Sequence, residues 1–165
     1  MDINKSSRHS KITGDFGESL ILYWLSKHGF ECALVDHTGI DIIARRPKSN
    51  EVMGISVKSR CRNKGTESDY VSIKAKDISH AREACSAFKC VPYFAIVVDA
   101  GQMIRAYILP LYHFLEIYPL KQTGASWKMN YASIDMYEKD PSIMVFEYCL
   151  RTQRIAGQNL QKFKA

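Results

Sequence analysis

Two stretches of β-type sequence each carry a charged side chain that could do chemistry, near the start of the first and at the end of the second. Asp41 lies near the start of IDIIARR (40–46), and Lys58 lies at the end of EVMGISVK (51–58). The intervening PKSN has turn composition, so the two stretches are expected to form an antiparallel hairpin. Antiparallel pairing brings the start of one arm beside the end of the other. An aspartate beside a lysine in this arrangement can hold a metal ion and a phosphate group.

Two further side chains belong to the same scheme. Ser56 lies two residues before Lys58, and because alternate residues of a strand share a face, both side chains are expected to point the same way. Glu18 lies in GDFGES, near the start of a predicted helix that precedes the hairpin. Carboxylate oxygens are the ligands that hard cations such as Mg²⁺ prefer. Asp41 and Glu18 are therefore candidate cation ligands, whereas the hydroxyl of Ser56 supplies no negative charge.

Basic residues are concentrated around the same hairpin. The segment from Arg45 to Lys64 has seven lysines and arginines against one acidic residue, Glu51. A basic cluster beside a candidate metal and phosphate site indicates a nucleic-acid partner, and the net charge of +6 for the whole chain agrees with this interpretation. The candidates for contacts with phosphate groups are Arg45, Arg46, Arg60, Arg62 and Lys64.

The predicted elements explain how these side chains are positioned. One helix is expected to begin at Gly14 and to end at Gly29, and a second is expected over 74–89. Strand patterns cover residues 30–35, 40–46, 51–58, 70–73, 91–99 and 103–109. The run over 91–99 is almost continuously apolar, which is typical of a strand covered on both faces. The order α-β-β-β-(β)-α-β-β predicts an α/β fold with a mixed central β-sheet flanked by helices.

The rest of the chain is expected to extend this one domain. A short helix is predicted over 110–118 and a loop over 121–126, while the apolar segments WKMNYASIDMY and SIMVFEY fit either a strand or a helix. We predict a flexible N-terminus over 1–12, a single domain over 13–150 with a core at 13–110 and a C-terminal extension at 111–150, and a basic tail over 151–165.

Composition and length narrow the class of protein. With 165 residues, 46% of them hydrophobic and 24% charged, the chain suits one globular domain. The longest apolar run, ILYWL (21–25), is far shorter than a membrane span, and the polar N-terminal segment does not resemble a signal peptide. The five cysteines have no C-x-x-C spacing, which disfavours a zinc knuckle or a disulfide framework. These features predict a cytoplasmic protein without a membrane partner.

Three motifs in this order resemble the PD-(D/E)xK nuclease superfamily, which has the restriction-endonuclease-like fold. They are G-x-x-x-E ending at Glu18, G-x-D-x-x-A around Asp41 and I-x-V-K-S-R around Lys58. The group that the chain most resembles is the archaeal Holliday junction resolvases and their relatives. Their first helix carries a glutamate and ends in a glycine and an aromatic residue, as HGF does at 28–30. The resemblance covers residues 13–110.

The resemblance implies a role for each residue of the site. Asp41 corresponds to the metal-binding aspartate, Glu18 to the helix glutamate that supplements the metal site, and Lys58 to the lysine of the E-x-K element. The main-chain carbonyl of Val57 is a further implied metal ligand. Ser56 departs from the pattern, because the family usually has a glutamate there. The implied cofactor is Mg²⁺ or Mn²⁺, which lowers the pKa of bound water and offsets the charge of the phosphate.

The resulting prediction is a metal-dependent DNA endonuclease, with Asp41, Lys58, Glu18 and Ser56 at its catalytic site. A structure-specific enzyme of repair or recombination is one form of this prediction, and since many relatives work as dimers, a homodimer is one assembly that it allows. The first alternative is a catalytically inactive nucleic-acid-binding protein of the same fold, because a carboxylate is missing at position 56. The second is a protein-interaction or regulatory domain whose basic face is only a solvated surface.

Overall fold

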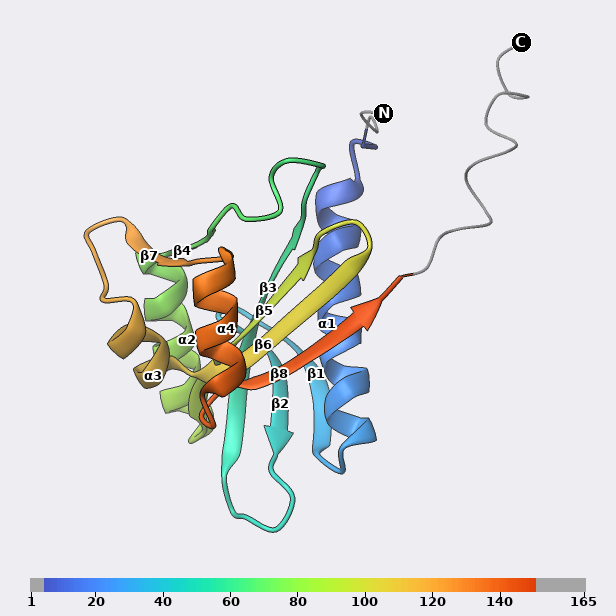
Figure 1. The fold of residues 1–165 in the computed structure, drawn as a ribbon. Helices are drawn as coiled ribbons and strands as arrows, with labels where there is room; N and C mark the ends of the chain where they lie inside the picture. Colours follow the sequence, from blue (N-terminus) through green and yellow to red (C-terminus); the bar gives the residue numbers. More distant parts are fainter. Residues whose placement is uncertain (1–4, 151–165) are drawn as a thin grey trace.

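A six-stranded mixed β-sheet forms the centre of the protein in a computed structural model that describes residues 5–150 (Figure 1). Its strands lie in the order β1-β2-β3-β5-β6-β8. Strands β3 and β5 run parallel, whereas every other neighbouring pair in this sheet is antiparallel. The strands are β1 (Glu31–His37), β2 (Ile40–Arg45), β3 (Val52–Cys61), β5 (Val91–Asp99), β6 (Met103–Pro110) and β8 (Met144–Cys149).

Different elements cover the two faces of the sheet. Helix α1 (His9–Lys27) packs on one face through Ile21 and Leu25, which belong to the same buried cluster as Ile55 and Val57 of β3. The opposite face is covered by α2 (Ala75–Phe88), α3 (Leu111–Ile117), α4 (Tyr131–Lys139) and a small second sheet of β4 (Val71–Lys74) and β7 (Gly124–Trp127). The predicted α/β fold with a mixed sheet flanked by helices is therefore confirmed. None of the helices within residues 5–150 is long and apolar enough to cross a membrane.

Strand β5 lies at the centre of both hydrophobic cores, as its nearly continuous apolar sequence predicted. Phe94 and Ile96 pack on the side of α2 and α3, whereas Ala95 and Val97 pack on the side of α1. All four side chains are buried. Strand β5 pairs with β3 from Met53 to Cys61, and β3 carries most of the candidate site.

Helix α1 begins earlier than the sequence indicated. It starts at His9 and not at Gly14, so residues 9–12 belong to the helix and not to a flexible segment. No side chain caps its first turn, so the sequence contained no capping signal from which the true start could be predicted. The segment before the helix is held by the sheet, because Lys5 Nζ donates a hydrogen bond to the Cys61 carbonyl oxygen at 3.0 Å.

The C-terminal extension contains a strand that the sequence did not indicate. Strand β7 overlaps the predicted loop over 121–126 and pairs with β4, where Trp127 lies opposite Val71. Trp127 and Tyr137 are fully buried and stack on each other with ring centroids 3.9 Å apart. The two segments whose pattern fitted either element form α4 and β8. The predicted basic tail over 151–165 lies outside the described residues.

Candidate active site

Asp41 lies where the hairpin of β2 and β3 opens. The backbone pairing of the two strands ends at Ile42 and Ile55, although both strands continue beyond this pair. Asp41 precedes Ile42 in β2, and its Oδ2 atom accepts a hydrogen bond from the backbone N–H of Val57 at 2.6 Å. The carboxylate thus takes the place of the next backbone partner, and the two strands separate around it.

The backbone of Val57 offers a second oxygen at the same place. In an extended strand, the N–H and C=O groups of one residue point to the same side. Because the N–H of Val57 points toward Asp41, its carbonyl oxygen faces the same gap between the strands. A carbonyl ligand at Val57 requires this orientation.

Ser56 and Lys58 share one face of β3, as the alternation of the strand predicts. The residues beside them, Ile55 and Val57, pack under α1, so Ser56 and Lys58 point away from that helix. Ser56 is only 1% exposed, whereas Lys58 is partly exposed. Burial raises the pKa of both Asp41 and Glu18, and the positive charge of Lys58 opposes this rise, so its ammonium group lies within electrostatic range of the two carboxyl groups.

Glu18 of α1 lies within electrostatic range of Asp41. Burial raises the pKa of its carboxyl group, and the negative charge of Asp41 raises it further. Burial also raises the pKa of Asp41, against the lowering effects of the Val57 N–H and of Lys58. Two neighbouring carboxyl groups that are both costly to ionise favour a bound cation. Because a carboxylate must be ionised to bind a metal, the affinity for a cation rises as the pH rises through these raised pKa values.

The oxygen atoms at this place fit a hard divalent cation. Asp41 and Glu18 supply two carboxylates and Val57 a carbonyl, and Mg²⁺ is commonly held by one or two carboxylates with water in the remaining positions. Residues 5–150 contain no group of three or more His, Cys, Asp or Glu side chains placed to hold a metal ion. A third carboxylate is absent because Ser56 occupies the position across from Asp41, one step beyond the last backbone pair.

Two glycines that the predicted site did not include determine how closely the elements approach. Gly17 of α1 lies against β3, and a Cβ atom there would fall only 1.7 Å from Ser59 Oγ. Gly39, in the turn before Asp41, has φ +103°, and a Cβ atom there would fall 2.3 Å from the His80 carbonyl oxygen. Gly39 belongs to the G-x-D motif, so the sequence contained a signal for it. The partner of Gly17 lies far along the chain, and no local pattern indicates this contact.

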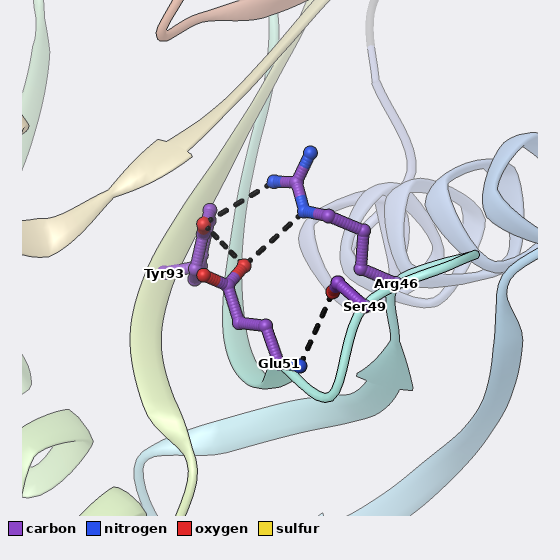
Figure 2. Close-up of polar contacts among 4 residues, drawn as sticks. All are labelled: Arg46, Ser49, Glu51 and Tyr93. Carbon is purple, nitrogen blue, oxygen red and sulfur yellow. Dashed lines mark hydrogen bonds and ion pairs between the residues drawn. The ribbon is translucent and has the colours of Figure 1, made fainter.

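Arg45 and Arg46 lie at the closed end of the hairpin, about 13 Å or more along β2 from Asp41. Figure 2 shows Arg46 in a polar cluster with Glu51 and Tyr93. Arg46 Nε lies 3.2 Å from Glu51 Oε1, and Tyr93 Oη donates a hydrogen bond to the same oxygen at 2.8 Å. Arg46 Nη2 also donates to Tyr93 Oη at 3.3 Å. Arg46 therefore ties the hairpin to β5, whereas Arg45 is exposed.

Arg60, Arg62 and Lys64 lie at the other end of β3, past the candidate site. Arg60 and Lys64 are exposed. Arg62 supports the loop that follows β3, because its Nη2 donates to the carbonyl oxygens of Asp69 at 3.1 Å and Tyr70 at 2.8 Å. The basic residues therefore lie in two groups at opposite ends of β3, and their contacts with phosphate groups stay a prediction.

The comparison with solved structures supports the fold. No protein-family model and no curated protein matches the sequence. Among solved structures, the chain is similar to Hjc, a Holliday junction resolvase from the archaeal hyperthermophile Archaeoglobus fulgidus, with a TM-score of 0.54. The match has 16% sequence identity and covers 74% of this chain and 93% of the resolvase chain. A likeness at this level of identity concerns the fold, which is a central mixed sheet flanked by helices.

Proposed function

We propose that the chain is a metal-dependent DNA endonuclease that hydrolyses phosphodiester bonds at the site of Glu18, Asp41, Val57 and Lys58. The observation that carries the proposal is the hydrogen bond between Asp41 and the Val57 backbone where the hairpin opens, with Glu18 and Lys58 within electrostatic range of it. The fold that surrounds this site is similar to that of a Holliday junction resolvase.

The residues divide the chemistry among them. The bound Mg²⁺ or Mn²⁺ would supply charge neutralisation and a water of lowered pKa. Asp41 and Glu18 hold the cation, and the Val57 N–H fixes Asp41 through one carboxylate oxygen, which leaves the other free to bind. Lys58 orients the attacking water and stabilises the negative charge that develops on the phosphate. Arg60 and Lys64 contact neighbouring phosphate groups.

Cleavage assays test the proposal directly. The purified chain is incubated with linear duplex, single-stranded and branched DNA in the presence of Mg²⁺ or Mn²⁺. We expect cleavage that stops when the metal is chelated, with branched DNA included because of the resolvase fold. Cleavage that continues in the presence of a chelator would exclude the metal-dependent mechanism.

Ser56 favours a second candidate function, that of a catalytically inactive nucleic-acid-binding protein. The side chain across from Asp41 is a buried serine, so the site has one carboxylate fewer than the family pattern. An inactive binding protein would bind DNA equally well with and without metal. Its affinity would fall with salt at a log–log slope of about −0.9 for each phosphate contacted. Binding without cleavage on all substrates would select this candidate.

Replacing Ser56 with glutamate should restore a third carboxylate. In the presence of a chelator, we expect the melting temperature to fall, because a buried carboxylate beside Asp41 is costly to ionise. We expect affinity for Mn²⁺ to rise about tenfold or more, because affinity follows the number of charged ligands, and bound metal should then recover the melting temperature. Mn²⁺ titration and thermal unfolding measure the two effects.

The matched control is Ser56→Gln, which has the size of glutamate without its charge. It should lower the melting temperature through overpacking alone and should leave the affinity for Mn²⁺ unchanged. Equal affinities for Mn²⁺ in the two variants would show that position 56 does not face the metal.

A further inference from the structure

Two adjoining hollows lie at the end of the molecule where β3 and β5 finish and α1 begins. The first has a volume of about 330 Å³ and an almost wholly apolar surface, and we name it the apolar chamber. Its apolar lining comes from Ile12, Phe16, Val97, Ile104 and Leu150. This volume lies within the range of small-molecule sites in proteins.

The second hollow has a volume of about 300 Å³, and we name it the basic chamber. Lys5 and Arg60 line it together with Ser10 and Thr13, and none of its lining residues is acidic. Lys5 Nζ donates to the Cys61 carbonyl oxygen, which holds its ammonium group at this place. Two cationic side chains without an acidic neighbour in the lining suit a phosphate group.

The two chambers have lining residues in common and therefore adjoin, so one ligand can extend from one chamber into the other. His9, Thr13, Ser59 and Arg60 line the apolar and the basic chamber alike. The hydroxyl of Ser59 is itself buried and lies against Gly17 of α1.

We propose that the two chambers together bind one nucleotide, with the base in the apolar chamber and the phosphate in the basic chamber. Phe16 is 44% exposed and offers its ring for stacking on a base. Asp99 lines the apolar chamber, so its negative charge disfavours the phosphate there and fixes the orientation of the ligand. A purely apolar ligand would leave the positive charges of Lys5 and Arg60 uncompensated, and a simple anion would leave the apolar wall in water.

The position of the chambers relates this nucleotide to the candidate active site. Arg60 follows Lys58 by two residues of strand, about 7 Å, and Phe16 precedes Glu18 by two residues of α1. A nucleotide in the chambers would therefore flank the phosphodiester bond that the site is proposed to cleave. As a subsite for the substrate strand it rests on the proposed function, whereas the binding of a nucleotide does not require cleavage.

The first test uses free nucleotides and the full chain in the presence of a chelator. We expect nucleoside monophosphates to bind more tightly than either the matching nucleosides or inorganic phosphate, as measured by calorimetry. Phe16→Ala should weaken this binding about tenfold through the loss of stacking, and Arg60→Gln should weaken it through the loss of a phosphate contact. Both side chains are exposed enough for the variants to keep the fold, which thermal unfolding checks.

Two control variants are matched to these. Tyr23→Ala removes an aromatic ring of similar exposure from α1, and Arg82→Gln removes an exposed arginine from α2, and neither residue lines a chamber. Both controls should bind nucleotides like the unchanged protein. Equal effects of control and test variants, or no binding of any nucleoside monophosphate or labelled strand, would overturn the proposal.

The second test distinguishes a nucleotide within a strand from a free nucleotide. A short single-stranded oligonucleotide with one 2-aminopurine is titrated with the chain, again without metal. A fluorescence change that Phe16→Ala abolishes assigns the chambers to the substrate strand. If free nucleotides bind and the oligonucleotide does not compete with them, the chambers are assigned to a free ligand. If the unchanged protein binds nucleotides but cleaves none of the substrates, the nuclease function is refuted and this nucleotide site remains.

Discussion

Replacing Asp41 with asparagine is expected to reduce metal-dependent cleavage about a thousandfold while leaving the protein folded. Asparagine keeps an oxygen that accepts the hydrogen bond from the Val57 N–H, so the open hairpin retains its shape. It removes the negative charge that holds the cation. Because burial raises the pKa of Asp41, the ionised carboxylate costs stability at neutral pH. The melting temperature in the presence of a chelator should therefore stay equal or rise while the cleavage rate collapses.

The control for this variant is Asp36→Asn on the neighbouring strand β1. Asp36 is exposed and takes no part in the candidate site, so its replacement should change neither the cleavage rate nor Mn²⁺ binding. Lys58→Ala should lower the cleavage rate like Asp41→Asn but should leave Mn²⁺ bound, since lysine is not a ligand. Cleavage by Asp41→Asn at the rate of the unchanged protein would show that the site lies elsewhere.

Replacing Gly17 with alanine is expected to destabilise the fold by about 1 to 3 kcal/mol. A Cβ atom at position 17 would lie 1.7 Å from Ser59 Oγ and 2.9 Å from Ser59 Cβ, so α1 must move away from β3. Such a movement also carries Glu18 away from Asp41. Chemical denaturation should show the loss of stability, and Mn²⁺ titration should show weaker metal binding.

Gly14→Ala is the matched control on the same helix. A Cβ atom at position 14 has nothing within 4 Å, so the higher helix propensity of alanine should stabilise the protein by up to about 1 kcal/mol. Combining Gly17→Ala with Ser59→Ala removes the closer of the two clashes and should recover part of the lost stability. A Gly17→Ala variant as stable as Gly14→Ala would mean that α1 does not pack against β3 at this point.

The sequence predicted the framework of the candidate site because that framework rests on local patterns. Alternation along 51–58 placed Ser56 and Lys58 on one face of a strand, and the polar turn between two apolar runs predicted the hairpin that joins them to Asp41. The apolar run at 91–99 matches β5 at both ends, because a strand covered on both faces has no exposed positions to interrupt it.

Other features depended on contacts that no local pattern contains. The start of α1 at His9 lacks a capping side chain, and β7 forms because β4 pairs with it. Arg46 appeared free to contact a phosphate group, but it is engaged with Glu51 and with Tyr93, which comes from a strand far along the chain. The basic residues around the hairpin are close in sequence, yet an extended strand separates its ends by about 3.3 Å per residue.

By itself, the sequence determined which side chains are able to do chemistry and on which strand or helix each one lies. The tertiary structure decided which of them meet. It opened the hairpin at Asp41, brought Glu18 to it through the close packing of Gly17 against Ser59, and formed the two chambers between α1 and the ends of β3 and β5. The physical reason is that periodicity and turn chemistry act over a few residues, whereas packing joins residues of any separation along the chain.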